Sequence, residues 1–271
     1  MKYYYPEHII GYQRIKAEGK TAWNEIHGSI GFENFSSREF LAFVLPKLQF
    51  STPNPAVLEY GCGTGPGACF LAERGFQVDG IDIIPTAIEM AKQIAKEQNL
   101  DIHYEVQDIC ELSHEGKKYD MIVDSYCLQG IVTDADREKV FSAVHARLKP
   151  EGYYLISTAI FDEERFGEEV RIDKETGWIY NKYGDSIIDT RTSIVYIQLD
   201  EEPSDYEEAI KIGNVWYLPN RRHLKPPDLK EEIEAVGFKV LYQDGGNVIC
   251  VYGGGVKNRK VYPVGKRTQD G

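Results

Sequence analysis

Short runs of apolar residues alternate with amphipathic segments between residues 56 and 252 of this 271-residue chain. Several runs are continuously apolar, such as YYLI at 153–156, which is typical of parallel strands covered on both faces. The alternation predicts a doubly wound α/β fold with a mostly parallel sheet. Strands are expected at residues 57–60, 78–82, 103–108, 121–124, 153–158, 239–242 and 248–252.

Helices are expected between these strands, because apolar residues recur three and four positions apart at 85–99 and 134–148. Thr133 and Asp136 have the spacing of a capping box at the start of the second helix. Gly75 and Gly237 stand where a helix would stop in the left-handed conformation.

Two segments fall outside the alternation and predict additions to the core at 51–160 and 227–252. Residues 1–50 contain an aromatic stretch and a helical pattern at 36–48, so we expect an N-terminal helical lid. Residues 161–226 are acidic and include the strand-like TSIVYIQL, so we expect an inserted cap that faces the substrate. The glycine-rich, basic tail at 253–271 has no readable role.

The formal net charge of −12 disfavours nucleic acid as a partner, because there is no excess of basic groups to release counterions. No stretch approaches the roughly 20 apolar residues that span a bilayer, and no signal peptide is recognisable, so we expect a cytoplasmic protein without membrane contact. The five cysteines lack the spacing of zinc or redox sites and indicate reduced thiols and no metal. Monomer and homodimer both remain open.

The strongest chemical signal is VLEYGCGTGPG at 57–67, where a strand runs into a glycine-rich turn that opens a helix. Gly61, Gly63 and Gly65 lack a Cβ, so they can adopt positive φ and let a bulky ligand lie against the backbone. Pro66 stands where the dinucleotide fingerprint has its third glycine, and the Lys of a phosphate loop is absent. The turn therefore favours a nucleoside ligand without phosphates.

Acidic residues end the next three expected strands, and the carboxyl ends of parallel strands share one rim of the sheet. Asp82 stands where a carboxylate accepts hydrogen bonds from two ribose hydroxyls. Asp108, beside Ile109, suits the exocyclic amine of an adenine ring held against apolar neighbours. Asp124 and Ser125 end the following strand.

The motifs EYGCGTG, VDGIDI, QDI, YDMIVDS and LKPEGYYLIST resemble, in order, those of the class I S-adenosylmethionine-dependent methyltransferases. The resemblance covers roughly residues 55–160, and EAVGFKV and NVICVYG match the closing hairpin of that family. It implies a Rossmann-like sheet of seven strands with the last antiparallel, S-adenosylmethionine as cofactor and S-adenosylhomocysteine as product. Glu151 stands where a glycine is common in the family, and we expect the turn to tolerate it because Gly152 is kept.

The cofactor-binding residues expected in the core are Glu59, Gly61, Cys62, Gly63, Asp82, Ile83, Asp108, Ile109, Asp124 and Ser125. By the resemblance, the glycines line the methionine part, Asp82 holds the ribose and Ile83 packs on the adenine. In the lid, the ring of Trp23 could stabilise a sulfonium and His27 could contact the cofactor, although packing or a surface position explains either residue as well.

The acceptor side is less defined, because methyl transfer from a sulfonium depends mainly on positioning and a general base is needed only for some acceptors. Tyr126 and His223 are candidates for catalysis, with His223 as a base. The candidates for substrate contact, each with packing or ion pairing as the alternative, are Tyr12, Tyr126, Trp178, Trp216 and Arg221.

The favoured function is methyl transfer to an O- or N-nucleophile of a small molecule, because the cap would enclose a metabolite. A protein or peptide acceptor, a non-catalytic S-adenosylmethionine-binding protein and a nicotinamide-dependent oxidoreductase are the alternatives. Pro66 argues against the last of these.

Overall fold

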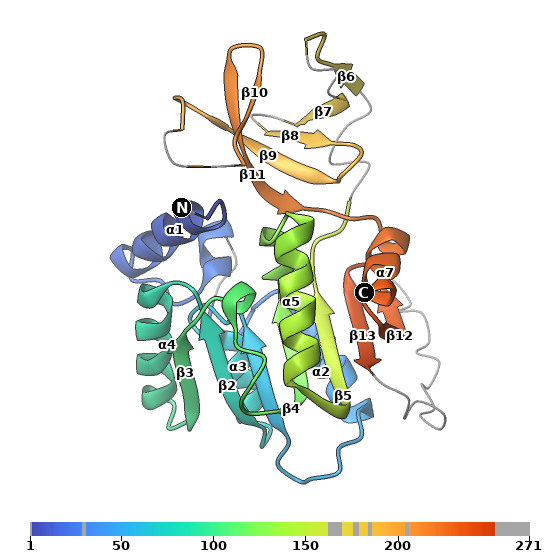
Figure 1. Ribbon diagram of the computed structural model, residues 1–271. Coiled ribbons are helices and arrows are strands. Elements are labelled where there is room, and N and C mark those ends of the chain that lie inside the picture. Colours follow the sequence, from blue (N-terminus) through green and yellow to red (C-terminus); the bar gives the residue numbers. More distant parts are fainter. Residues whose placement is uncertain are drawn as a thin grey trace, which may run out of the picture.

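The computed structural model describes residues 2–28, 31–161, 170–175, 179–183, 186–203, 206 and 208–252. A seven-stranded sheet in the order β12-β13-β5-β4-β1-β2-β3 forms the core (Figure 1). Its five parallel strands are β1 (Ala56–Tyr60), β2 (Gln77–Asp82), β3 (Ile102–Val106), β4 (Tyr119–Ser125) and β5 (Leu148–Ser157). The sheet closes with β12 (Phe238–Asp244) and β13 (Asn247–Tyr252), where β13 is antiparallel to both neighbours. The expected fold class is confirmed.

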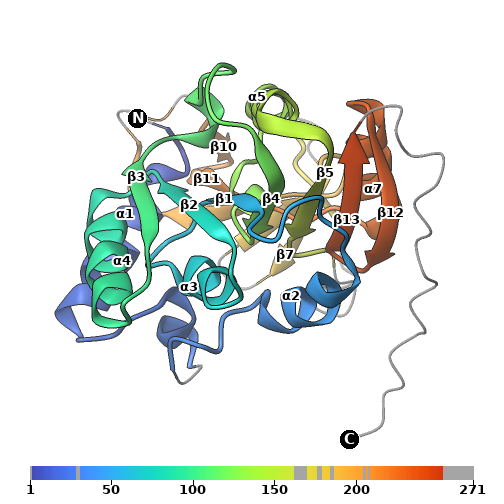
Figure 2. The same ribbon diagram turned by 90° about the horizontal axis from the view of Figure 1, so that it is seen from below.

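Helices cover both faces of this sheet (Figure 2). On one face lie α2 (Arg38–Val44), α3 (Pro66–Ala72) and α4 (Pro85–Glu97), and on the other α5 (Asp134–Arg147) and α7 (Pro226–Ala235). Neighbouring strand residues alternate between the two apolar layers: Val57 packs in the first and Leu58 in the second. Burial on both faces explains why the central strands have continuously apolar sequences.

The expected helix signals are present, whereas the turn expected around Gly152 lies inside β5, at a shift of register against β4. The Thr133 side chain accepts a hydrogen bond from Asp136 N at 3.2 Å at the start of α5. Gly75 and Gly237 have φ of +86° and +91°. Glu151, however, has φ of +65°, which is the left-handed region that favours glycine. The chain therefore tolerates Glu151, as expected, but with a backbone strain that the sequence did not reveal.

The N-terminal segment holds α1 (Tyr5–Ala17) and the short helices η1 (Trp23–His27) and η2 (Leu45–Lys47). The pattern at 36–48 is found as α2 and η2, whereas α1 was not expected as a helix. Tyr12 and Ile15 of α1 pack against Ile84 and Ala87, at the start of α4. This contact places α1 over the carboxyl ends of the strands, between the core and the inserted segment (Figure 1).

The inserted segment forms a second, antiparallel sheet in the order β10-β11-β9-β8-β7-β6. Its strands are β6 (Val170–Ile172), β7 (Ile179–Tyr183), β8 (Ser186–Asp189), β9 (Ile194–Leu199), β10 (Ile210–Ile212) and β11 (Val215–Arg222). Phe161 N donates to Leu224 O at 3.0 Å, so the entry and exit of the insertion lie side by side. β11 leads from this sheet back to α7 of the core (Figure 1).

Two global properties bear on the sequence expectations. No helix in the described part of the chain is long and apolar enough to cross a membrane. The described residues also contain no group of three or more His, Cys, Asp or Glu side chains arranged to hold a metal ion. The tail at 253–271 lies outside the described residues.

Candidate functional site

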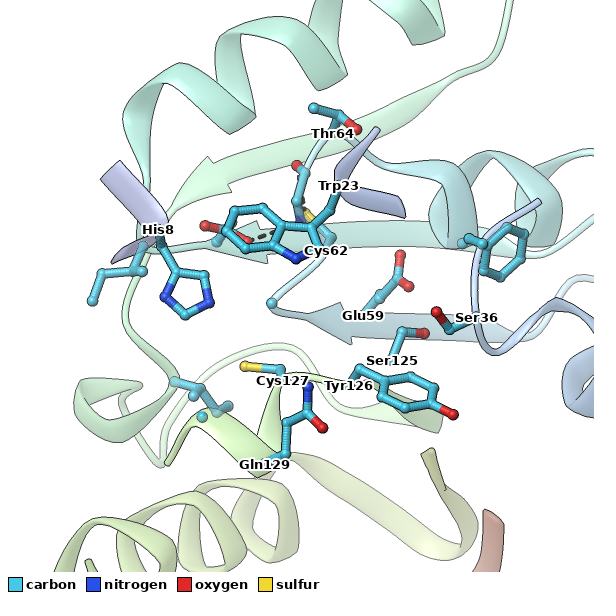
Figure 3. Close-up of a pocket in the computed structure, with 18 of the residues that line it drawn as sticks. His8, Trp23, Ser36, Glu59, Cys62, Thr64, Ser125, Tyr126, Cys127 and Gln129 are labelled. Carbon is cyan, nitrogen blue, oxygen red and sulfur yellow. Dashed lines mark hydrogen bonds between the residues drawn. The ribbon is translucent and has the colours of Figure 1, made fainter. Parts of the chain in front are cut away.

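A cavity of about 280 Å³ lies at the carboxyl ends of β1, β2 and β4 (Figure 3). Its walls come from the glycine-rich turn, from α1 and η1 above it, and from the end of β11. Thirteen of the residues expected at the site line this cavity: Tyr12, Trp23, Glu59, Gly61, Cys62, Gly63, Asp82, Ile83, Asp108, Ile109, Ser125, Tyr126 and Arg221. The structure thus brings together most of the candidates from both the core and the additions.

The glycine-rich turn uses the left-handed conformation at Gly61, Gly63 and Gly65, with φ of +62°, +57° and +86°. A Cβ on Gly61 would lie 2.4 Å from the Cβ of Cys127, and one on Gly63 would lie 2.4 Å from the Tyr12 hydroxyl. No larger residue fits either position without movement of these neighbours. Both glycines line the cavity, and the absence of a Cβ lets Cys127 and Tyr12 pack closely against the turn.

Asp82 fixes the turn to the end of β2. Its two carboxylate oxygens accept hydrogen bonds from Gly63 N and Ile84 N, both at 2.9 Å. Burial raises the pKa of Asp82, and these N–H donors oppose that effect. Each oxygen keeps a further acceptor site, so the carboxylate can also bind ligand hydroxyls.

Asp108 reaches the cavity from a position different from the one expected. β3 ends at Val106, and Asp108 caps the short helix η3 (Ile109–Glu111) by accepting from Cys110 N at 2.8 Å. Its other oxygen accepts from the Tyr4 hydroxyl at 2.8 Å. The strand expected at 103–108 is therefore too long, because the Asp108 side chain satisfies a helix start instead.

Glu59 is buried in the cavity wall and has an orphaned oxygen. Its Oε2 has no hydrogen-bond partner, and Gly67 leaves space for its Oε1, which a Cβ there would approach to 2.1 Å. Burial raises the pKa of Glu59 to about 8. A buried carboxyl group with a free oxygen suits a cationic group of a ligand, which would stabilise its charged form.

Asp124 does not line the cavity, although the sequence suggested that it would contact the cofactor. Its Oδ1 accepts from Cys127 N at 3.0 Å and from Leu128 N at 2.8 Å, and burial raises its pKa to about 7. It holds the loop after β4, in which Tyr126 adopts φ of +64° at the cavity wall. Asp124 therefore lies behind the cavity wall and stabilises the loop that contributes Tyr126 and Cys127 to it.

Several other candidates lie elsewhere. His223 is 7% exposed, and its backbone N donates to Ser193 O, away from the cavity. Trp216 pairs across β11 and β9 with Leu199, with the Lys211 ammonium 5.2 Å from its ring centre. Trp178 and the side chain of His27 lie outside the described residues.

Sequence reasoning missed several residues of the cavity wall, among them Tyr4, His8, Phe35, Ser36, Ser37, Gln107, Cys127 and Gln129. Tyr4, His8 and Tyr12 recur every four residues, which is the spacing of one helix face. This spacing could have predicted α1 from the sequence. The contributions of Gln107, Cys127 and Gln129 depend on loop conformation, for which the sequence carries no comparable pattern.

An ion pair joins the N-terminal helix to the inserted sheet at the cavity. Glu7 of α1 accepts from Arg221 of β11 through both carboxylate oxygens, at 2.8 and 3.1 Å, and from Asn220 at 2.6 Å. Burial alone would raise the pKa of Glu7, but Arg221 and His8 outweigh it, and the pKa is lowered. The two additions thus form one roof over the core.

Comparison with known proteins shows what the core of the chain is similar to. Residues 57–152 match the model of a protein family whose description is "Methyltransferase domain". The ubiquinone biosynthesis O-methyltransferase of Coxiella burnetii (strain Dugway 5J108-111) is 32% identical over 110 residues, which are 41% of this chain and 46% of that protein. Residues 57–152 of the chain therefore form a methyltransferase domain.

Solved structures share the fold of this methyltransferase domain and of much of its additions. An S-adenosylmethionine-dependent methyltransferase from Clostridium acetobutylicum ATCC 824 superposes with a TM-score of 0.57 at 16% identity, over 90% of this chain and 99% of that one. The glycopeptide N-methyltransferase MtfA complexed with S-adenosylmethionine has a TM-score of 0.51 at 18% identity, over 82% and 93%. The matched part is 46% of the Coxiella protein, so the chain spans less than half the length of this relative.

Proposed function

We propose that the chain binds S-adenosylmethionine in this cavity and transfers its methyl group to an oxygen or nitrogen of a small molecule. The observation that carries the proposal is the joint placement of the bare glycine turn and the Asp82 carboxylate, linked by Gly63 N, at one end of the cavity. This is where doubly wound sheets bind nucleosides.

The residues of the cavity fit a cationic nucleoside. The orphaned Oε2 of Glu59 supplies a carboxyl group for an ammonium, while Asp82 and Asp108 offer acceptors for hydroxyls and an amine. The rings of Tyr12 and Trp23, whose centres are 5.1 Å apart, offer faces to a sulfonium. Among the described residues of the wall, Arg221 is the one arginine or lysine, and it is paired with Glu7, which does not favour phosphates.

When bound, S-adenosylmethionine supplies an activated methyl group on a positively charged sulfur. The chain's contribution is to orient the two reactants, which accounts for a large part of catalysis in such displacements. Asp82 and the glycine turn hold the nucleoside, and α1 with η1 covers it and excludes water. Tyr126, strained at the end of β4, and Arg221 define the acceptor side of the cavity.

A small acceptor is favoured over a peptide because the roof, built from both additions, covers one side of the cavity. The Coxiella relative is named as an O-methyltransferase of ubiquinone biosynthesis, and MtfA as an N-methyltransferase of a glycopeptide. Both activities act on nucleophilic oxygen or nitrogen, so the acceptor proposed here is a phenol, hydroxyl or amine.

Calorimetric titration with S-adenosylmethionine and S-adenosylhomocysteine tests the proposal. Binding with a Kd on the order of micromolar, about −8 kcal/mol, is expected for both. Asp82→Asn should weaken it by about tenfold or more, because the loss of charge weakens contacts to hydroxyls and to Gly63 N. Asp79→Asn on the same strand is the control, since Asp79 binds Lys117 and Tyr119 outside the cavity.

Incubation with a panel of phenols, alcohols, amines and short peptides then tests turnover, with S-adenosylhomocysteine measured by mass spectrometry. Product with a small acceptor supports the proposal, whereas product with peptides alone would replace its substrate class. Absence of cofactor binding together with tight NADH binding would overturn it in favour of an oxidoreductase. Binding without turnover on any acceptor would favour a non-catalytic binding protein.

A further inference from the structure

His8 is a half-buried histidine in the cavity wall that the proposed function does not yet use. It lies on α1, and its ring stacks on that of Trp23 with centres 5.3 Å apart and an interplanar angle of 30°. Figure 3 shows the two rings on one side of the cavity and Cys127 and Gln129 on the other. The stacking fixes the ring plane of His8 toward the space between them.

A backbone contact determines the tautomer of His8. Nδ1 lies 2.6 Å from Tyr4 O, one helical turn earlier. A carbonyl oxygen can only accept, so Nδ1 must carry the proton. In the neutral ring, Nε2 therefore presents an unprotonated lone pair, and no partner for it is found among the described residues.

The surroundings keep this imidazole neutral and yet able to take up a proton. Burial is the main cause that lowers the pKa of His8, and the Arg221 guanidinium of β11 lowers it further. The carboxylates of Glu7 on α1 and Asp82 on β2 act in the opposite direction, as does the Tyr4 carbonyl. An imidazolium formed here would thus have two carboxylates nearby to stabilise it.

The other polar groups of the described cavity wall are less suited to accept a proton. Asp82 and Asp108 each use both oxygens in hydrogen bonds from the protein. Burial raises the pKa of the Cys127 thiol well above its usual value, so the thiol stays protonated. Glu59 lies next to the glycine turn, where the proposed function already assigns it to the cofactor's cation.

We propose, on the basis of the function inferred above, that Nε2 of His8 accepts the proton which the acceptor loses as it is methylated. A bond forms between the methyl carbon and the acceptor's oxygen or nitrogen, the carbon–sulfur bond breaks, and its electron pair stays on sulfur. The acceptor's proton moves to Nε2. One positive charge is lost at sulfur and one appears on the imidazole, so the charge of the cavity is unchanged.

The first test needs no acceptor. NMR of the protein with isotope-labelled histidine, with His8 assigned by comparison with His8→Asn, reports its tautomer and charge. We expect a neutral ring protonated at Nδ1 near neutral pH, with a midpoint below that of an exposed histidine. A ring protonated at Nε2, or charged at neutral pH, would overturn the proposal.

The second test asks whether His8 is close to the reacting centre. A sulfonium near Nε2 disfavours the imidazolium, so His8 should titrate lower in the S-adenosylmethionine complex than in the S-adenosylhomocysteine complex, by on the order of one pH unit. Equal midpoints in the two complexes would overturn the inference while leaving the proposed function intact. Failure of both ligands to bind in calorimetry would instead reject the proposed function.

Kinetics with an acceptor found in the panel completes the test. His8→Asn keeps an N–H donor for Tyr4 O but has no base, so kcat should fall by about 100-fold or more while KM changes little. The loss should shrink at higher pH for an ionisable acceptor such as a phenol. His114→Asn, an exposed histidine outside the cavity, is the control. A kcat of His8→Asn within about threefold of wild type would contradict the proposal.

Discussion

The floor and the roof of the cavity are built in different ways. The floor consists of the turns after β1, β2 and β4, where carboxylates such as Asp82 bind backbone N–H groups 2 and 19 positions away in the sequence. The roof joins α1 to β11 through Glu7 and Arg221, which are 214 positions apart. The floor is therefore a set of local motifs, whereas the roof exists only once the whole chain is folded.

Gly61→Ala should disrupt the glycine turn of the floor and cause the largest loss of cofactor affinity. The added Cβ would lie 2.4 Å from the Cβ of Cys127 and would impose positive φ on alanine. We expect affinity for S-adenosylmethionine to fall by about 100-fold or more in calorimetry, because the turn must move. Gly75→Ala is the control, since its φ is also positive but a Cβ there meets nothing.

A second variant separates the steric cause from the backbone cause. Cys127→Gly removes both side-chain atoms that the alanine Cβ would meet, Cβ and Sγ, so Gly61→Ala combined with Cys127→Gly should recover part of the affinity. Retention of nearly wild-type binding by Gly61→Ala alone would show that the turn is not the binding surface.

Glu59→Gln should change how the free energy of unfolding depends on pH. The floor contains buried carboxyl groups with a raised pKa, and Glu59 is one of them. The pKa of Glu59 is raised by burial from 4.5 to about 8, so the folded state binds the proton more tightly than the unfolded chain. Its stabilisation is complete below the unfolded pKa and is lost as pH rises to about 8. The free energy of unfolding without ligand should therefore decline by roughly 3–5 kcal/mol more over this range in wild type than in the variant.

Urea unfolding at a series of pH values measures this difference. Asp124, with its pKa raised to about 7, remains in the variant and leaves part of the decline. Glu73→Gln, at an exposed position after α3, should leave the wild-type profile unchanged. Identical profiles for Glu59→Gln and wild type would mean that Glu59 titrates normally in the folded protein.

Breaking the Glu7–Arg221 pair should loosen the roof and leave the floor intact. The pair is bidentate, with side chains 38% and 15% exposed, so a coupling energy of about 1 kcal/mol is expected from a double-mutant cycle with Glu7→Gln and Arg221→Gln. Cofactor affinity should change by less than about threefold, because no turn of the floor is altered. Glu18→Gln, in the exposed pair with Arg14, should have no measurable effect.

Exchange of the charges in Glu7→Arg with Arg221→Glu should restore part of the coupling, although Asn220 would lose its acceptor. A larger loss of cofactor affinity in Glu7→Gln than in Asp82→Asn would contradict the division between floor and roof.

The same division explains how far the sequence could be interpreted. The glycine turn, the acids at the end of β2 and after β3, and the antiparallel closing strand follow from short motifs in the sequence. The pairing of Arg221 with Glu7 has no such local signal. β11 also bulges between Pro219 and Arg221, which changes the side of the strand that later residues face and which the sequence did not reveal.

Glu151→Gly tests the smallest predicted effect, a departure from the family's pattern inside the core. Glu151 adopts φ of +65°, which destabilises a residue with a Cβ by about 1 kcal/mol. Glycine removes this strain, but it also increases the conformational entropy of the unfolded chain, which offsets part of the gain in stability. We expect the variant to be about 0.5 kcal/mol more stable in urea unfolding, with cofactor affinity unchanged. Glu151→Ala is the matched control, because alanine keeps the Cβ and should not gain this stability. If alanine stabilised the protein as much as glycine, the glutamate side chain, and not the left-handed backbone, would be the source of the strain.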